Sequence, residues 1–265
     1  MLKRFLVSLL LFTAVGQAAA VDNYIDYTDI YYVLAEQGYG FNVVENDRAT
    51  GRFMFVTFFI YGPDNQPTWY TAQLTLDVSG NFNGTLYATT GTYYGMSWNP
   101  SDHPDPVVVG TASFQPTSPY TAKFIFVVNG PPMVTVTKTI QRQFLGNFAI
   151  GGSYSGVAST TYAACANPGH FLNDVDITVT QNTSGAVSIV LNYIGSGTIC
   201  TYSGNLIAWG KLYQITTAQY TCTNGFKTTA KIDQLIATPH GIEAVWSDIT
   251  PAGCNESGVF NGLLQ

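Results

Sequence analysis

Short segments in which apolar and polar residues alternate recur along the chain, and they constrain its fold more than any other feature. Val175, Ile177 and Val179 alternate with polar residues, and segments 187–193 and 242–246 repeat the pattern. Successive side chains of a strand point to opposite faces, so this alternation predicts antiparallel sheets with one solvated face. We therefore expect an all-β protein with little or no helix.

The first half of the chain contains a similar series of segments. Segment 52–61 is apolar on both faces, which predicts a strand with both faces covered. The only helix candidate is 29–37, where Ile30, Tyr31 and Leu34 would share one helix face. Because each half has about seven or eight strand segments with turns between them, we expect two antiparallel β-barrel or β-sandwich modules in tandem.

The cysteines divide the chain into two unlike halves. All four of them lie in the second half, and an even number of cysteines in an exported chain predicts disulfides. Three pairings are possible. We favour Cys200–Cys222, which would tie neighbouring strands, and Cys165–Cys254, which would close the module end to end. The first would stabilise the module by about 3 kcal/mol and the second by about 4–5 kcal/mol.

A boundary between the modules is predicted near residues 144–147. Residues 21–145 would then form a cysteine-free β module, and residues 146–265 a disulfide-containing β module.

Residues 1–20 have the parts of a secretory signal peptide: a basic start at Lys3 and Arg4, an apolar run, and three alanines at 18–20. We expect the mature chain to begin near Val21 and the protein to be secreted or periplasmic. The apolar run is shorter than the about 20 residues that a membrane-spanning helix needs. No second long apolar segment follows, so we expect no helical membrane span.

The charge balance argues against several classes of partner. The chain has 10 basic and 16 acidic residues, and removal of Lys3 and Arg4 leaves 8 against 16, a net charge of −8. A surface without a basic patch does not bind nucleic acid or anionic membranes. No C-x-x-C motif occurs and no histidine lies at ligand spacing from a cysteine, so neither a metal site nor a cofactor is predicted.

Aromatic residues near strand ends are the most plentiful candidate binding residues: Trp69, Tyr70, Tyr94 and Trp98. Exposed rings can stack on sugars or fill a pocket of a partner protein. The alternative is packing in the core or across strands. Since neighbouring strand residues point to opposite faces, we expect one ring of each adjacent pair to be buried.

His103 lies between two aspartates and two prolines in segment 101–106. Such a segment could hold a metal ion or place a general base, and the alternative is a rigid turn fixed by the prolines. No G-x-S-x-G motif is present, and the cysteines are expected to be bridged. A glycosidase pair would have to come from the aspartates or from Glu36, Glu45, Glu243 and Glu256. Glu243, on the face opposite Trp246, is the most interesting of them. We expect no enzyme.

Residues 31–41 resemble the start of a known module. They read Tyr-Tyr-Val-Leu-Ala-Glu-Gln-Gly-Tyr-Gly-Phe, which resembles the opening Trp-Trp-Asn-Pro-x-Glu-Ser-Gly-x-Gly-Phe of an uncharacterised all-β module in secreted proteobacterial proteins. Val33-Leu34 replace Asn-Pro, and Gln37 replaces Ser. Further matches follow in order at 62–70, 84–87, 90–91, 98–100, 110–112 and 137–140.

The second half is similar to the cysteine-containing β domain that often follows this module. The resembling residues are 200–204, Cys222 and Cys254. The resemblance implies a bacterial source, export and an all-β fold, and it implies no reaction.

These features predict a secreted or periplasmic, non-catalytic binding protein that recognises carbohydrate or an envelope or extracellular protein through exposed aromatics. The first alternative is a barrel that binds a small ligand inside, as lipocalin- and avidin-type barrels do. Two further alternatives are a glycoside hydrolase with an unrecognised carboxylate pair and an outer-membrane barrel. Exposed coplanar rings would favour sugar binding, and a deep cavity with a few polar groups would favour a small ligand.

Overall fold

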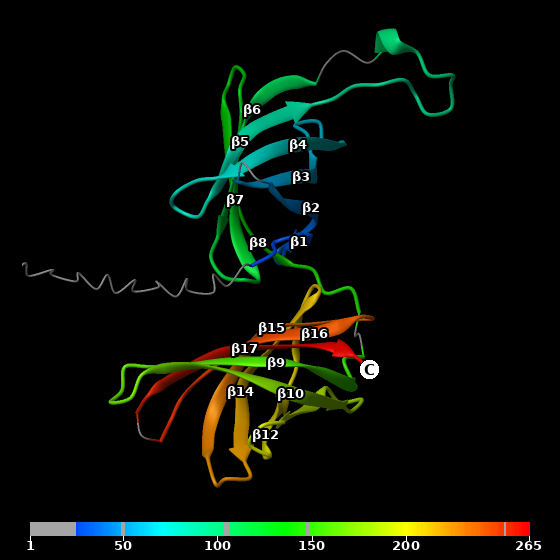
Figure 1. The fold of residues 1–265 in the computed structure, drawn as a ribbon. Helices are drawn as coiled ribbons and strands as arrows, with labels where there is room; N and C mark the ends of the chain where they lie inside the picture. The colour runs from blue at the N-terminus through cyan, green and yellow to red at the C-terminus, as the bar shows by residue number, and fades with distance from the viewer. Residues whose placement is uncertain (1–24, 49–50, 103–105, 147–148, 252) are drawn as a thin grey trace, which may run out of the picture.

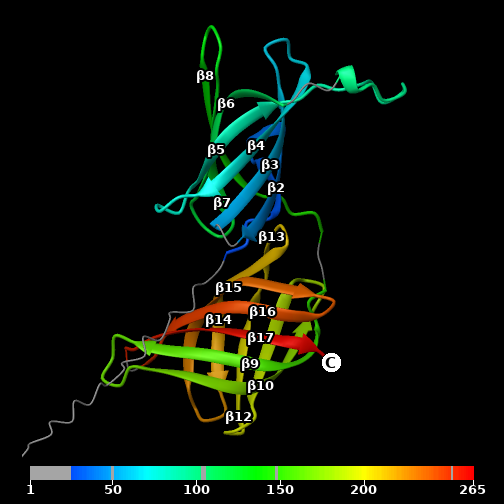
Figure 2. The ribbon, with the colours of Figure 1, turned by 45° about the horizontal axis from the view of Figure 1, so that its top comes forward.

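Two closed antiparallel β-barrels in tandem make up the protein (Figures 1 and 2). The computed structural model describes residues 25–48, 51–102, 106–146, 149–251 and 253–265. Over these residues the elements are strands and one 3₁₀ turn, η1 (Pro100–Asp102). The expected all-β fold with two modules in tandem is confirmed, and both modules are barrels.

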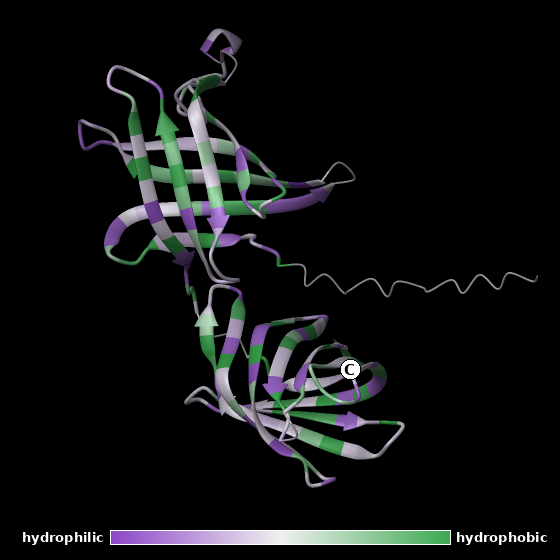
Figure 3. Cartoon of the chain, turned by 90° about the vertical axis from the view of Figure 1, so that its left-hand side faces the viewer, coloured by the Kyte–Doolittle hydropathy of each residue, from purple (hydrophilic) through white to green (hydrophobic). Residues whose placement is uncertain are grey.

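Barrel 1 is an up-and-down meander in which each strand pairs with the next and β1 closes on β8. The alternation of hydrophobic and hydrophilic residues along its strands is visible in Figure 3. Its strands are β1 (Asp29–Val33), β2 (Glu36–Arg48), β3 (Gly51–Tyr61), β4 (Pro67–Leu76), β5 (Phe82–Ala88), β6 (Val107–Pro116), β7 (Thr121–Val128) and β8 (Val134–Arg142).

Aromatic side chains fill the interior of barrel 1. Phe41 stacks on Phe58 at 5.7 Å between ring centroids, and Phe124 lies edge-on to both at 5.1 Å. All three are buried. Small barrels of eight strands have an interior that side chains can fill completely, and barrel 1 is of this kind.

The outer face of β3 corrects one expectation. Met54, Val56 and Phe58 point into barrel 1 and are buried, whereas Phe59 is half exposed. The prediction that both faces of this segment are covered is wrong, because β3 is part of a barrel wall whose outer face meets solvent.

The helix candidate 29–37 is also wrong. These residues form β1 and the start of β2. Tyr31 and Val33 are buried at the two-residue period of a strand, while Ile30 and Leu34 are exposed. The pairing of β1 with β2 and β8 outweighs the weak helical spacing of the apolar residues.

Barrel 2 has the strand order β12-β11-β10-β9-β17-β16-β15-β14, and pairing of β12 with β14 closes it. The short β13 adds to β14 at one end. The strands are β9 (Gly152–Ala163), β10 (Gly169–Gln181), β11 (Ala186–Tyr193), β12 (Thr198–Asn205), β13 (Ile207–Trp209), β14 (Leu212–Cys222), β15 (Lys227–Thr238), β16 (Gly241–Ile249) and β17 (Asn255–Leu264).

Both favoured disulfides are present. Cys200–Cys222 joins directly opposite residues of β12 and β14, the seam that closes the barrel. Cys165–Cys254 joins the β9–β10 loop to the β16–β17 loop. The predicted boundary lies in the connection between β8 and β9.

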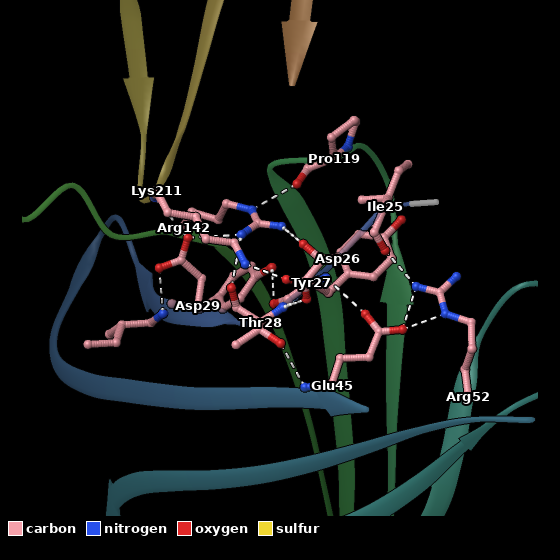
Figure 4. A network of polar contacts seen from close by, with 12 residues as sticks. Ile25, Asp26, Tyr27, Thr28, Asp29, Glu45, Arg52, Pro119, Arg142 and Lys211 are labelled. Carbon is pink, nitrogen blue, oxygen red and sulfur yellow. Dashed lines mark hydrogen bonds and ion pairs between the residues drawn. The ribbon is translucent and has the colours of Figure 1, made fainter. Parts of the chain in front are cut away.

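A buried arginine anchors the end of barrel 1 that faces barrel 2 (Figure 4). The Arg142 guanidinium donates to the carbonyl oxygens of Pro119 and Asp26 and to Asp29 Oδ2, the last at 2.9 Å. Asp29 Oδ2 also accepts a hydrogen bond at 3.0 Å from the backbone N–H of Lys211, at the start of barrel 2 strand β14. The ion pair of barrel 1 is therefore part of the contact between the barrels.

A tyrosine makes the second contact between the barrels. Tyr120, in the β6–β7 loop, stacks on Trp209 of β13 with ring centroids 5.3 Å apart. Its hydroxyl donates a hydrogen bond to the Asp233 carboxylate and accepts one from the backbone N–H of Gln234 at 3.0 Å. Gln234 has a positive φ of 51° at an irregularity in the pairing of β15 with β16. A local bulge therefore directs this N–H toward the other barrel.

Candidate ligand-binding site

The aromatic residues singled out in the sequence lie on barrel 1. Trp69 is half exposed on the outer face of β4, and Tyr70 points the other way and packs against the core beside Phe58. Tyr94 and Trp98 lie in the β5–β6 connection, which projects from the barrel (Figure 1). The structure therefore separates Tyr70 from the exposed rings. His103 lies outside the described residues.

Exposed apolar side chains gather at the end of barrel 1 that carries the β3–β4 and β5–β6 connections. Tyr94 is 94% exposed and Trp98 is 68% exposed. The rings of Tyr93 and Tyr94 lie 4.6 Å apart but are tilted by 54°, so this pair is not a coplanar platform. Phe59 and Trp69 are directly opposite each other on β3 and β4. We call this group, Phe59, Tyr61, Trp69, Tyr93, Tyr94 and Trp98, the aromatic rim.

Barrel 2 contains a cavity of about 330 Å³ at one end of its interior. This end is formed by the start of β12 and the end of β14, so it is the end remote from Trp209 and barrel 1. Six strands contribute to its walls. The lining residues are Thr160, Tyr162, Phe171, Asn173, Tyr193, Ser196, Thr198, Cys200, Tyr220, Cys222, Asn224, Phe226 and Glu256.

Packed aromatic rings form much of the cavity wall. Tyr220 stacks on the buried Tyr202 at 4.2 Å with an interplanar angle of 5°, and Phe226 lies edge-on to Tyr220 at 5.6 Å. On the other side Tyr162 and Phe171 meet edge-on at 5.8 Å. Such contacts hold each ring in place and add to the energy of burial. Packed rings therefore form one part of the wall, and polar side chains such as Asn173, Thr198 and Asn224 form the rest.

Two carboxyl groups lie side by side at this end of barrel 2, and one of them lines the cavity. Asp248 on β16 and Glu256 on β17 are directly opposite residues of the two strands. They are only 8% and 4% exposed. Glu256 lines the cavity, and the Tyr162 hydroxyl, on the next strand β9, hydrogen-bonds to it. With both carboxyls ionised, neither Asp248 oxygen nor Glu256 Oε2 has a hydrogen-bond donor.

A proton shared by Asp248 and Glu256 supplies the missing hydrogen-bond donor and reduces the repulsion between the two carboxyls. Burial, and then repulsion by Glu256, raises the pKa of Asp248 to about 7. Burial also raises the pKa of Glu256, while hydrogen bonds with Tyr162 and Asp248 oppose the rise. A carboxyl group that holds its proton can donate to its neighbour, whereas two carboxylates cannot hydrogen-bond to each other. Near neutral pH the pair therefore changes its charge.

The sequence contained a signal for this pair. The alternation through Ile242, Ala244 and Trp246 continues to Asp248, which places that carboxyl on the inner face. Glu256 and the aspartates are among the carboxyls that the sequence offers for such a pair, but the strand pattern alone favours Glu243. Glu243 is exposed on the outer wall, on the face opposite Trp246 as expected. What the sequence lacked was the pairing of β16 with β17 that brings Asp248 to Glu256.

Three other hollows in the described part of the chain are larger. One of about 590 Å³ lies beside the connection between the barrels and is lined by Phe144 and Tyr213 among others. Another of about 520 Å³ runs along the outer wall of barrel 2 past Glu243, and one of about 450 Å³ follows outward residues of β5–β7 such as Thr85. Among these four hollows, the cavity at Glu256 is the one with a buried carboxyl group in its lining.

Over the described residues, no group of three or more His, Cys, Asp or Glu side chains is placed to hold a metal ion. A helix suited to crossing a membrane is likewise not found in that part of the chain. No protein-family model matches the sequence, and the comparison with curated proteins finds no relative. The resemblance to the secreted proteobacterial module stays a prediction.

Proposed function

We propose that the protein is an exported, non-catalytic binding protein that holds a small ligand in the open end of barrel 2. The observation that carries this proposal is the cavity of about 330 Å³ inside that barrel. Ligand sites are concave and mainly apolar, with a few polar groups that fix orientation, and the mouths of β-barrels are common places for them. The aromatic rings in the wall, together with the buried Glu256 and other polar side chains, match the concave form and the polar groups of such sites.

The contrast between the two barrels supports this assignment. Both are closed eight-stranded barrels, but phenylalanine rings fill barrel 1. Barrel 2 instead leaves one end of its interior open beside Tyr162 and Tyr220. A protein that evolved only for stability would fill this space as well, because close packing stabilises a core. The open end therefore points to a ligand.

Export of the protein is supported by its cysteines. Both disulfides, Cys200–Cys222 and Cys165–Cys254, are formed, and the described residues contain no free cysteine. Disulfides persist in oxidising compartments and are rare in the cytosol. Together with the signal-like residues 1–20, this supports a secreted or periplasmic location.

The carboxyl pair supports binding rather than glycoside hydrolysis. Glycosidases place their carboxyls about 5–5.5 Å apart when they retain configuration, and about 6.5–9.5 Å apart when they invert it. Asp248 and Glu256 instead hydrogen-bond directly to each other when one is protonated. A sugar bond and an attacking water do not fit between groups in contact.

A second candidate function is recognition of carbohydrate or of an envelope or extracellular protein by the aromatic rim of barrel 1. The exposure of Tyr94 and Trp98 on a projecting connection favours it. Exposed tyrosine and tryptophan rings are common anchors in binding interfaces. This function would be independent of the cavity in barrel 2.

A thermal-shift screen of the oxidised mature protein separates the two functions. A ligand of the folded state raises the melting temperature by mass action. Asn173 and Leu172 are neighbours on β10, and Asn173 lines the cavity whereas Leu172 does not. A cavity ligand should lose its shift with Asn173→Trp, which fills the cavity, and keep it with the control Leu172→Trp.

Other results of the same screen have distinct meanings. A shift that survives Asn173→Trp but disappears with Trp98→Ala would support the rim. The proposed function of barrel 2 is wrong if no metabolite, sugar or amine gives a thermal shift that Asn173→Trp abolishes and Leu172→Trp keeps.

A further inference from the structure

We infer that the ligand of barrel 2 is a small organic cation, an amine or quaternary ammonium compound whose positive charge lies against the Glu256 carboxylate. This inference rests on the proposed function of the cavity and narrows it to one ligand class. Three observations carry it: a buried carboxyl pair beside the cavity, the absence of basic groups in the cavity wall, and the aromatic rings around it.

The first observation is the buried carboxyl pair beside the cavity. Glu256 is 4% exposed and lines the cavity, and Asp248 next to it is 8% exposed. A proton shared by the pair supplies their mutual hydrogen bond but leaves one negative charge in the buried site. A buried charge without a counter-ion is costly, and a cation in the cavity would offset it.

The second observation concerns charge. None of the residues that line the cavity, all of them within the described part of the chain, is lysine, arginine or histidine. A carboxylate held in such surroundings has no counter-ion, and a cation supplies the missing positive charge. An anionic ligand would meet Glu256 with no basic group to offset the repulsion.

The third observation is the set of rings around the carboxyl. A cation within about 6 Å of an aromatic face is attracted by the ring quadrupole, more strongly when water is excluded. A neutral sugar could also donate hydroxyl hydrogen bonds, but it would leave the charge of Glu256 uncompensated. The aromatic residues of the wall are Tyr162, Phe171, Tyr193, Tyr220 and Phe226.

Binding of a cation should then depend on the charge of the carboxyl pair. Glu256 lines the cavity and Asp248 lies directly beside it, and the tyrosines that face them have raised pKa values, so these tyrosines stay neutral. The inner side chains contributed by β10 and β15 at this level, Asn173 and Ala230, carry no charge. The facing tyrosines are Tyr162 on β9, Tyr193 on β11, Tyr202 on β12 and Tyr220 on β14.

The test compares 2-phenylethylamine with 2-phenylethanol. These probes share the same phenylethyl body, but the head group is a charged ammonium in the first and a neutral hydroxyl in the second. Calorimetric titration of the full oxidised chain at pH 8 should give at least tenfold tighter binding of the amine. Glu256→Gln should remove that preference, because the amide keeps the shape but not the charge. Glu243→Gln, an exposed residue of the outer wall, should leave the preference intact.

A measurement on the unchanged protein covers the case in which Glu256→Gln does not fold. An alkylamine stays protonated between pH 6 and pH 8, as a lysine does. As Asp248 ionises, the Kd of the amine should fall about three- to tenfold over this range, with release of protons. The Kd of the alcohol should not change.

Two results would overturn the inference. One is equal affinity for the amine and the alcohol; the other is binding of neither probe. If a neutral compound from the screen still binds and Asn173→Trp excludes it, the proposed function of barrel 2 stands and only the cationic ligand is wrong. If no compound at all loses its thermal shift in Asn173→Trp, then both the cationic ligand and the proposed function of barrel 2 are wrong.

Discussion

At the scale of single residues, the Asp248–Glu256 pair makes barrel 2 less stable than its packing alone would allow. Two acids held together in a buried site must keep a proton or repel each other. Both residues face inward, next to well-packed positions such as Trp246 and Phe260. Glu256 lines the cavity, and residues that oppose stability beside a cavity are typical of binding sites, because selection for stability alone would replace them.

The first prediction concerns Asp248→Asn. The pKa of Asp248 is about 7 in the folded protein against 3.8 without the fold, so the folded state holds more protons between these values. The free energy of unfolding must then fall as pH rises from about 4 to about 7, and level off above. Asp248→Asn removes this loss and should stabilise barrel 2 at pH 8 by at most about 4 kcal/mol.

Urea unfolding at pH 5 and pH 8 measures this effect. Glu243→Gln is the matched control, because Glu243 is exposed on the same strand and should leave the pH dependence unchanged. A loss of stability with Asp248→Asn at pH 8 would contradict the argument.

At the scale of elements, the seam between β12 and β14 decides whether barrel 2 is closed. The Cys200–Cys222 disulfide crosses it, and both cysteines line the cavity. The double variant Cys200→Ser, Cys222→Ser should destabilise barrel 2 by about 3 kcal/mol, since the disulfide closes a loop of moderate length. We expect it to weaken ligand binding as well, because one wall of the cavity becomes mobile.

Calorimetry of the full chain checks this prediction. All four cysteines of the sequence belong to barrel 2, so barrel 1 contains none. Only the transition of barrel 2 should move, in the double variant and on reduction of the native protein. An equal shift of both transitions would mean that the barrels unfold as one unit.

The elements also show where sequence patterns were sufficient. The alternation in 175–179 and 242–246 was enough to predict strands β10 and β16. It was not enough for segment 29–37, where weak helical spacing competed with a strand and the strand prevailed through pairing with β8. Local periodicity predicts an element when one period dominates, and pairing partners decide when two periods compete.

At the scale of the whole molecule, a glycine permits the contact between the barrels. Gly210, in the β13–β14 turn, has a φ of +61°, and a Cβ there would lie 2.2 Å from Asp29 Oδ2. Gly210→Ala should therefore break the Asp29–Lys211 hydrogen bond and loosen the barrels. Gly185→Ala is the control, since Gly185 has a φ of +86° but open space around its Cβ position.

Small-angle scattering and calorimetry distinguish the two variants. Both substitutions should destabilise barrel 2 slightly, because alanine is strained at positive φ. Gly210→Ala alone should also broaden the distribution of distances within the molecule. If Gly185→Ala broadens it equally, the contact at Asp29 does not hold the barrels together.

The all-β class, the two modules and the favoured disulfides can be predicted from the amino-acid sequence. They follow from local period, turn residues and cysteine spacing, which are properties of neighbouring residues. Three features come from folding in three dimensions: barrel 1 is filled while barrel 2 keeps an open end, Asp248 meets Glu256, and Arg142 is linked through Asp29 to Lys211. Such contacts depend on which strands pair when a barrel closes and on how side-chain volumes fill its interior, and no local pattern encodes either.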